Sequence, residues 1–295
     1  MMKLNSKSLP SAITTQLNSK QQKIDDLIGF EQQAKKAKSL WENKIGSKKG
    51  KAAFAAVKNT LIGMCVSVEI CNYCEGNEAT DIEHIFPKSH FPDKTFVWEN
   101  YLLACKQCNT TYKRDKFAIF DRDTSVEIIE LNFKNHSLTP PYSSNAAFIN
   151  PRKENPLEYL WLDIKNTFLF VVIPTLSERD KQKAVFTLKT LGLNIREALV
   201  KARRSAAQYY YDRLESYVRI KEATDSDTVQ GYLPDFIRWD KNELFDEEKR
   251  RIMVNIQKDI QIHPHPTVWA EMKRQRSTLA QIRMLFERAP EALEW

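Results

Sequence analysis

Hydrophobic residues recur at helical spacing through the first 64 residues of the chain. Residues 11–44 contain few helix breakers, and intermittent apolar residues among lysines and glutamines predict one or two helices with a thin apolar stripe. From residue 52 to residue 64, Phe54, Val57 and Leu61 share one face at helical spacing, so a further helix is predicted there. Cys65 follows in the same apolar stretch, and we interpret it as a buried helix residue rather than a metal ligand.

The pattern changes to short apolar runs after residue 120 and then returns to helical repeats. Residues 126–131 predict a strand, and the longest apolar run, residues 168–173, predicts a buried strand. Ser177 with Asp180 three residues later signals the start of a helix that reaches Leu191 and stops at Gly192. Asn194 is then a candidate cap for a longer helix.

The longer helix has an apolar face and basic residues away from it. Its apolar positions are Ile195, Leu199, Ala202, Ala206, Tyr210, Leu214 and Tyr217. Its basic residues on the opposite face or the flank are Arg196, Lys201, Arg203 and Arg204. These side chains could contact a phosphate backbone or form an ordinary solvated face, and Glu197 on the same side favours the second interpretation. Pro266 predicts the start of a last helix, whose basic cluster of Lys273, Arg274 and Arg276 has the same two interpretations.

The charge of the chain favours a polyanionic partner without naming one. The 295 residues have a formal net charge of +7 and a sequence pI of about 9.0. No apolar run approaches the length needed to span a membrane, and the sequence contains no signal peptide. We therefore expect a soluble cytoplasmic protein.

Four of the five cysteines form two Cys-x-x-Cys pairs, Cys71 with Cys74 and Cys105 with Cys108. Two such pairs separated by thirty residues suit one tetrahedral zinc ion, which would clamp the intervening segment at both ends. A redox pair fits poorly with two pairs that flank a loop, and the odd cysteine count argues against disulfides. Structural zinc contributes roughly 10–16 kcal/mol in finger-type peptides, more than so short a segment could gain from packing.

The polar residues between and just beyond the cysteine pairs require a different metal. Glu83 and His84 lie in a short apolar stretch that Pro87 ends, and Asn109 lies in a polar stretch of helical character, so the local order is strand, loop, helix. One histidine can take a proton from water, while carboxylate and amide oxygens suit Mg²⁺ or a similar hard ion. Asn109 could instead cap its helix, and Asn100 could fix a turn.

These residues resemble the active site of the HNH, or His-Me finger, endonuclease family. The likeness rests on residues 83–87, on Asn100, and on Asn109 directly after Cys108. It implies a ββα-metal fold, in which two short antiparallel strands and a helix hold one divalent ion. It further implies that His84 is the general base and that Asn100 holds the loop and orients His84. Glu83 and Asn109 would bind the catalytic ion, Mg²⁺ or Mn²⁺.

The chain departs from many members of that family at two positions. The last motif residue is Asn109 rather than His, a variant found in active members. The first carboxylate is Glu83 where many members use Asp, so Asp81 is a second candidate ligand. The expected fold class is α+β, mainly α. Its zinc-stapled core at residues 67–120 lies between a helical segment at residues 1–66 and a mainly helical region at residues 121–295.

A narrower resemblance extends over roughly residues 60–210. Residues 71–116, 155–160 and 191–194, together with Ala202 and Arg203, are similar to the PtuB-type nucleases of Septu and retron anti-phage systems. The likeness implies an ABC-type ATPase of the PtuA kind as partner, retron RNA or DNA as a further candidate partner, and the flanking helices as docking surfaces.

Three function classes follow from these resemblances. The first is a metal-dependent HNH endonuclease that cuts DNA as the effector of an antiviral defence complex. The second is an RNA-cutting toxin of the same fold, aimed for example at transfer RNA. The third is a catalytically silent, zinc-stapled nucleic-acid-binding module, against which the intact Glu83, His84, Asn100 and Asn109 argue.

Overall fold

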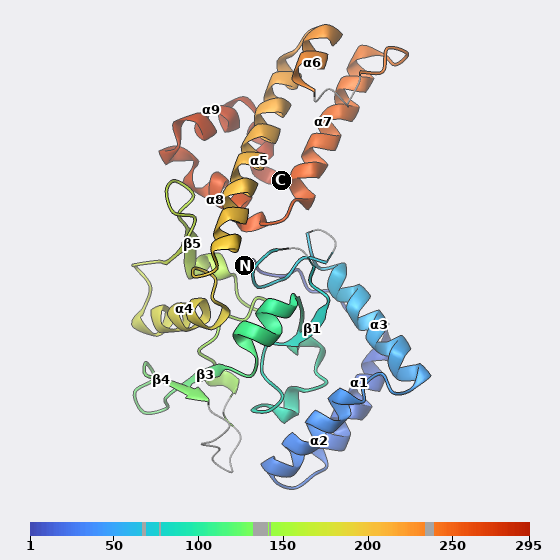
Figure 1. The fold of residues 1–295 in the computed structure, drawn as a ribbon, viewed down its shortest axis with the longest axis vertical. Helices are drawn as coiled ribbons and strands as arrows, with labels where there is room; N and C mark the ends of the chain where they lie inside the picture. The colour runs from blue at the N-terminus through green and yellow to red at the C-terminus, as the bar shows by residue number, and fades with distance from the viewer. Residues whose placement is uncertain (67–68, 77, 132–140, 142, 234–238) are drawn as a thin grey trace. The chain divides into compact units, whose positions relative to one another are not determined.

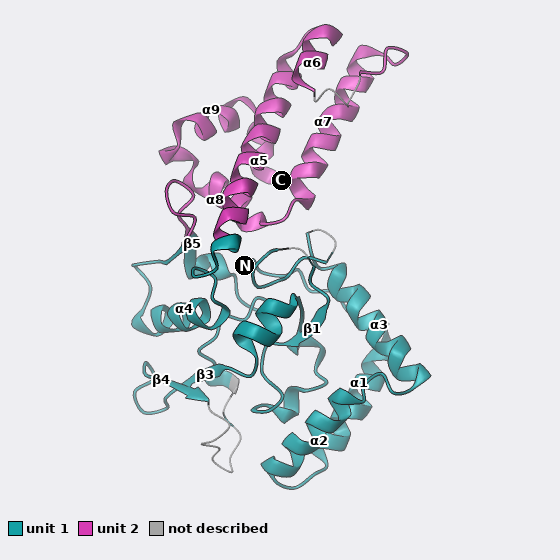
Figure 2. Ribbon diagram, viewed as in Figure 1, with its two compact units in different colours: residues 1–161, 170–199 teal, residues 162–169, 200–295 magenta. Residues whose placement is uncertain are grey.

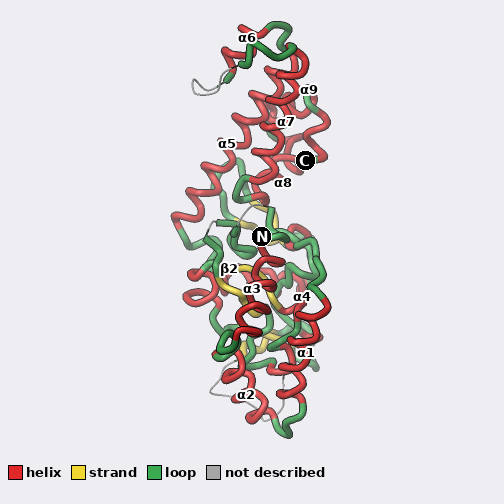
Figure 3. The backbone as a smooth tube through the Cα atoms, turned by 90° about the vertical axis from the view of Figure 1, so that its right-hand side faces the viewer, coloured by secondary structure: helices red, strands yellow, loops and turns green. Residues whose placement is uncertain are grey.

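Helices dominate the computed structural model (Figures 1 and 3), and this confirms the predicted class of a mainly helical α+β chain. The structure describes residues 1–66, 69–76, 78–131, 141, 143–233 and 239–295. Within those ranges the strands form three separate two-stranded sheets, β1 with β2, β3 with β4 and β5 with β6. None of the described helices is both long and apolar enough to cross a bilayer.

The chain divides into two compact units (Figure 2). Unit 1 comprises residues 1–161 and 170–199, and unit 2 comprises residues 162–169 and 200–295. Both predicted metal sites lie in unit 1. The three predicted segments, with boundaries after residues 66 and 120, mark changes of sequence character and stay a prediction.

The first helices of unit 1 follow the apolar pattern closely. The stretch predicted as one or two helices forms two, α1 (Ser11–Asp25) and α2 (Phe30–Glu42), and Gly29 between them has a φ of 93° that favours glycine. The predicted third helix is α3 (Lys48–Ile62), whose buried face includes the expected apolar residues. The prediction that Cys65 is a buried helix residue is wrong, because α3 ends first and the partly exposed Cys65 lies in the following turn.

A strand pair and a short helix form the centre of unit 1. β1 (Asp81–His84) pairs antiparallel with β2 (Tyr101–Ala104), so that His84 lies opposite Tyr101. A π-helical segment, η3 (Gln107–Lys113), follows β2 directly. The predicted order of strand, loop and helix is therefore confirmed. Asn109 lies inside η3 rather than at its start, so the alternative that it caps this helix is wrong.

The two strands predicted after residue 120 are present but shorter than predicted, and each pairs with a strand that was not predicted. β3 (Phe117–Phe120) pairs with β4 (Ile128–Leu131), and β5 (Leu160–Leu162) with β6 (Phe170–Val172). The apolar run at residues 168–173 does contain a strand, but the prediction of a buried strand is wrong in part, because Val171 is 37% exposed. A strand in a two-stranded sheet can cover only one face, so its alternate side chain faces outward.

Helix α4 (Glu178–Leu191) has the predicted ends. The Ser177 side chain accepts a hydrogen bond from the Asp180 amide, and Gly192 closes the helix in the left-handed conformation. Asn194, by contrast, does not cap the next helix. Its side chain instead pairs with both backbone polar groups of Phe170, accepting at 2.9 Å and donating at 2.8 Å, and so fixes the start of β6.

Unit 2 consists mainly of helices. They are α5 (Glu197–Glu222), which begins at the end of unit 1, α6 (Ser226–Tyr232), α7 (Phe245–Ile262), α8 (Pro266–Gln275) and α9 (Ala280–Arg288). Pro266 begins a helix as predicted, but residues 276–278 form a 3-10 turn that divides the expected last helix in two. Most predicted apolar positions of α5 are buried, whereas Ile195 precedes the helix and is 77% exposed.

Candidate functional site

The four cysteines of the two Cys-x-x-Cys pairs converge at one point in unit 1. Their Sγ atoms all lie within 4.8 Å of one another, and the Sγ atoms of Cys74 and Cys105 are 3.8 Å apart. A tetrahedral zinc ion with Zn–S bonds of about 2.3 Å needs sulfurs about 3.8 Å apart, so this donor set fits zinc. Burial among the other sulfurs raises the pKa of the Cys71 thiol well above its usual range, and a bound cation would reverse that shift.

The local sequence explains why the two cysteine pairs meet. Asn72, between the first two cysteines, donates its backbone amide to the Leu103 carbonyl, and its side chain accepts from the Leu103 amide, both at 2.9 Å. This attaches the first pair to β2. The second pair follows β2 directly, and the Cys108 amide points at the Cys105 sulfur at 3.4 Å. The β2 strand therefore sets the register of both pairs.

Arg196 contacts the cysteine cluster from a distant part of the sequence. Its guanidinium donates to Cys108 Sγ at 3.1 Å and to the Gln107 side chain at 2.8 Å, and it lies over the Tyr112 ring. Burial opposes its charge, but the Cys108 and Cys74 sulfurs outweigh that effect and raise the pKa of Arg196. Arg196 was a candidate phosphate ligand in the sequence. In the structure it contacts the cysteine cluster, where its positive charge would offset the negative charge of thiolates holding a zinc ion.

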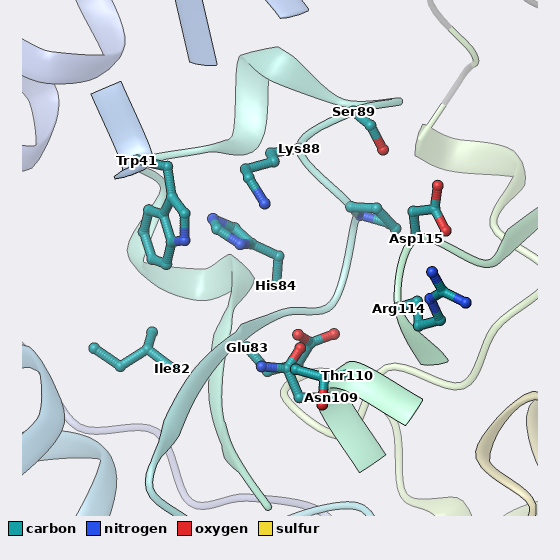
Figure 4. A pocket seen from close by; sticks show the side chains of 11 residues that line it. Trp41, Ile82, Glu83, His84, Lys88, Ser89, Asn109, Thr110, Arg114 and Asp115 are labelled. Carbon is teal, nitrogen blue, oxygen red and sulfur yellow. The ribbon is translucent and has the colours of Figure 1, made fainter. Parts of the chain in front are cut away.

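A cavity of about 470 Å³ opens beside β1 and η3 (Figure 4). It is lined by Trp41, Ile82, Glu83, His84, Pro87, Lys88, Ser89, Asn109, Thr110, Arg114 and Asp115. Three of the four predicted active-site residues, Glu83, His84 and Asn109, therefore face one space. We refer to it as the His84 cavity.

His84 is held in one orientation by three neighbours. Its Nε2 lies 2.9 Å from the Thr95 carbonyl oxygen and donates to it, which leaves Nδ1 of the neutral ring as an acceptor. The ring is packed between Trp41 and Tyr101, at centroid distances of 4.1 and 5.3 Å. The Tyr101 hydroxyl donates to the same Thr95 carbonyl at 2.7 Å. Burial lowers the pKa of His84 to about 3, with the Lys88 ammonium adding to the effect, so the imidazole is a neutral base at pH 7.

Asn100 lies beneath this arrangement and is 2% exposed. Its side-chain amide donates to the carbonyls of Phe86 and Lys94, at 3.0 and 2.8 Å, and its oxygen accepts from the Phe86 amide at 2.7 Å. One side chain thus ties together both ends of the loop that leads from His84 to Thr95. The orienting role that the family resemblance implies for Asn100 stays a prediction, and these hydrogen bonds are the contacts that it would use.

Glu83 makes a buried ion pair that the sequence did not reveal. Lys113 Nζ lies 2.6 Å from Glu83 Oε1, as an ion pair rather than a well-aligned hydrogen bond, and also donates to the His84 carbonyl at 2.7 Å. The two side chains are 0% and 6% exposed. Burial raises the pKa of Glu83, and Lys113 opposes that shift. Lys113 thus engages one carboxylate oxygen of Glu83, and the Glu83 side chain also lines the cavity.

Asn109 reaches the cavity from η3 and is oriented by Asp81. Its Nδ2 donates to Asp81 Oδ2 at 2.9 Å, so the amide oxygen is directed away from that carboxylate. Hard divalent ions take amide and carboxylate oxygens, and Asn109 with Glu83 supplies one of each, so the donor set fits Mg²⁺ or Mn²⁺. Asp81, the second candidate ligand, holds Asn109 from outside the lining of the cavity.

The remaining basic candidates are dispersed. Arg203 is 2% exposed and donates to the Phe168 carbonyl, so the prediction that it could contact phosphate is wrong. Lys201 and Arg204 are exposed on α5, as a solvated face requires. Sequence reasoning missed Trp41, Lys88 and Lys113, although the last two lie within a few residues of predicted site positions.

Comparison with known proteins agrees with this geometry. Residues 71–115 match the family model described as HNH endonuclease. Neither the curated proteins nor the solved structures give a match. The matched segment contains both cysteine pairs, the β1 and β2 strands and η3. The chain therefore contains an HNH endonuclease domain, whose family consists of metal-dependent nucleases.

Proposed function

We propose that this protein is an endonuclease that hydrolyses the phosphodiester bonds of DNA at the His84 cavity. The observation that supports this most strongly is the orientation of His84, whose Nε2 donates to the Thr95 carbonyl while the ring lines a cavity shared with Glu83 and Asn109. A neutral imidazole fixed in that tautomer has the free Nδ1 lone pair that a general base needs.

In this proposal the chain divides the chemistry among four residues. His84 takes a proton from the attacking water through Nδ1, while the Thr95 carbonyl stabilises the imidazolium through Nε2. Water adds to phosphorus, and the bond from phosphorus to the leaving oxygen breaks. Asn100 keeps the Thr95 loop in place. Glu83 and Asn109 hold a divalent ion, which when bound neutralises charge on the phosphoryl group.

The cysteine site has a structural task in the same proposal. A zinc ion at Cys71, Cys74, Cys105 and Cys108 fixes β2 to the start of η3. Since β2 carries Tyr101 and η3 carries Asn109, the zinc sets the register of the two sides of the cavity. A second, harder ion would be held by Glu83 and Asn109, apart from the cysteines.

We further propose that the protein is the effector of an anti-phage complex with an ABC-type ATPase of the PtuA kind. The support is its resemblance to PtuB-type nucleases. Two residues of that resemblance outside the matched domain have structural roles here. Gly192 is left-handed and lies against the Tyr112 ring, and Arg203 is buried. The likeness thus includes residues that support the fold as well as residues of the cavity.

The test incubates the zinc-loaded protein, alone and with a genetically neighbouring ATPase, with supercoiled plasmid and with total RNA. Mg²⁺ and Mn²⁺ are supplied in parallel, and a His84→Ala variant of equal zinc content is the control. Metal-dependent plasmid cleavage that requires His84 is the expected result. Cleavage of RNA alone would favour the RNA-cutting alternative, and cleavage of neither would favour a silent binding module. A nuclease that is fully active alone and does not bind the ATPase would contradict the proposed complex.

A further inference from the structure

Two cationic side chains, Lys88 and Arg114, line the His84 cavity together with two acidic ones, Glu83 and Asp115. Lys113 lies behind Glu83. Lys113 is neutralised by Glu83 and is fully buried, so it cannot meet a substrate. Arg114 is exposed at the cavity, where it can contact solvent. Lys88 is the cation that remains inside.

Lys88 is partly buried and makes no hydrogen bond or ion pair with any residue that the structure describes. Burial lowers the pKa of the Lys88 ammonium, and the charge of Glu83, which is ion-paired with Lys113, opposes that shift. Even partial removal of an ammonium from water is unfavourable when no partner replaces the water. A fold tolerates such a group where an anionic ligand supplies the missing partner, and an unpaired charge in a cavity is a common sign of a functional site.

The backbone around Lys88 is held firmly. The Pro87 carbonyl, immediately before it, accepts from the amides of His90 and Phe91 at 2.9 and 2.8 Å. Just upstream, the Ile85 amide donates to the Asn100 carbonyl and the Phe86 amide to the Asn100 side chain. The same asparagine that ties the Thr95 loop therefore also fixes the turn that carries Lys88.

The side chains of Lys88 and His84 lie next to each other in the His84 cavity. Both line the cavity, and the Lys88 side chain points toward the His84 ring in Figure 4. The Lys88 ammonium also lowers the pKa of His84, although burial has the larger effect. A phosphate that presents its phosphorus to water activated by His84 would thus place another of its oxygens within reach of Lys88.

We propose that Lys88 Nζ binds a non-bridging oxygen of the scissile phosphate and stabilises the negative charge that develops there during hydrolysis. This inference rests on the proposed nuclease function. In the reaction Lys88 stays protonated throughout and donates hydrogen bonds, while the water proton goes to His84 and the leaving oxygen takes its proton from solvent. Lys88 is then a catalytic residue alongside His84, and it does not belong to the metal ligands.

Three variants of the zinc-loaded protein test the proposal. Lys88→Met removes the charge and keeps much of the side-chain length, and Lys88→Arg keeps the charge. Lys116→Met is the matched control, because it removes one lysine charge from an exposed position that does not line the cavity. The probe in the absence of Mg²⁺ and Mn²⁺ is inorganic phosphate, measured by ³¹P line broadening. Lys88→Met should weaken phosphate binding by about tenfold, equivalent to about 1.4 kcal/mol, while Lys116→Met leaves it unchanged.

Cleavage kinetics provide the second readout. For Lys88→Met, kcat should fall by about 100-fold with little change in the Mg²⁺ requirement, as expected when one charge-stabilising donor is lost. Lys88→Arg should recover part of that loss. The melting temperature of Lys88→Met should be equal to or above that of the parent, because no hydrogen bond or ion pair with a described residue is lost.

Each outcome decides the proposal. Equal phosphate binding by Lys88→Met and the parent would overturn it, and so would the absence of phosphate binding by the parent. Wild-type cleavage that Lys88→Met retains in full would overturn it while leaving the proposed nuclease intact. A parent protein that binds phosphate through Lys88 but cuts no nucleic acid would refute the nuclease function and the catalytic role together, leaving only a phosphate site.

Discussion

Removal of Lys113 tests whether the buried Glu83–Lys113 pair supports the site. Lys113→Met deletes an ion pair of 2.6 Å and a hydrogen bond of 2.7 Å to the His84 carbonyl, both in a fully buried setting. Breaking a buried pair from one side costs about 3–5 kcal/mol, because the other charge is left without compensation. For a unit of this size that cost corresponds to a fall of roughly 10 °C in Tm.

The loss should depend on pH in a definite direction. Burial raises the pKa of Glu83, and Lys113 opposes the shift, so Lys113→Met raises that pKa further. A carboxyl whose folded pKa lies above its unfolded pKa makes the folded state bind the extra proton, so stability falls as pH rises. The destabilisation by Lys113→Met should therefore be larger at pH 8 than at pH 6.

Urea unfolding followed by circular dichroism, with zinc bound and Mg²⁺ absent, measures this effect. Glu83→Gln combined with Lys113→Met is the matched control, since replacement of both partners removes the stranded charge. The double variant should regain at least about 2 kcal/mol relative to the sum of the single variants. A cost below about 1 kcal/mol for Lys113→Met, or additive single losses, would refute the pair as a stabilising element.

Three further changes have defined outcomes. Gly192→Ala places a Cβ 2.2 Å from the Tyr112 ring at a φ of +59°, so it should destabilise unit 1 and weaken Mn²⁺ binding, which EPR measures. The control is Gly231→Ala in α6, where the added Cβ meets nothing within 4 Å, and its stability should be unchanged or slightly higher. Unchanged Mn²⁺ binding and Tm in Gly192→Ala would show that this contact does not position η3. Arg196→Met removes the hydrogen bond to Cys108 Sγ and should speed the transfer of zinc to a chromogenic chelator. The control variant Lys201→Met, on the exposed face of α5, should leave the transfer rate unchanged. Equal rates for the two variants would contradict a role of Arg196 in stabilising the zinc-bound thiolates. Because the pKa of His84 is lowered to about 3, the folded state does not bind the proton that the unfolded state binds below pH 6.5. When the pH falls from 7.5 to 5.5, the free energy of unfolding of the wild type should therefore drop by about 1.4 kcal/mol more than that of His84→Gln. Urea midpoints that change in parallel for the two proteins would contradict this.

The parts of the site that the sequence revealed are those set by local spacing. Cys71, Cys74, Cys105 and Cys108 could be assigned because two-residue gaps between thiols suit one zinc ion, and the structure brings their sulfurs within 4.8 Å. The Ser177 cap and the Gly192 stop follow from local backbone chemistry in the same way. Patterns of this kind predict structure only over a few residues, such as one helical turn or a tight loop.

The parts that the sequence did not reveal depend on tertiary contacts. Trp41 comes from α2 to pack on His84, and Arg196, the residue before α5, meets Cys108. Nothing in the local pattern of either residue distinguishes it from an ordinary amphipathic helix position. Asn194 shows the converse, because its local pattern suited a helix cap, yet the backbone of Phe170 satisfies its side chain.

Charge on a helix face was a poor guide for the same reason. Of the four basic residues of the α5 region, Arg203 is buried against a carbonyl and Arg196 serves the cysteine cluster. Lys88, which the sequence did not single out, lies in the cavity itself. The number of cations on a helix face therefore predicts phosphate binding less well than the partner that each cation already has in the fold.

The most direct test of the central claim is single-turnover cleavage of supercoiled plasmid by wild-type protein and His84→Ala. Both proteins are matched for zinc content and DNA binding and are measured across a Mg²⁺ titration. The proposed mechanism predicts Mg²⁺-dependent strand cleavage by the wild type and a loss of at least about 100-fold in the variant. Cleavage at equal rates by the two proteins would contradict the assignment of His84 as the general base of a phosphodiesterase site.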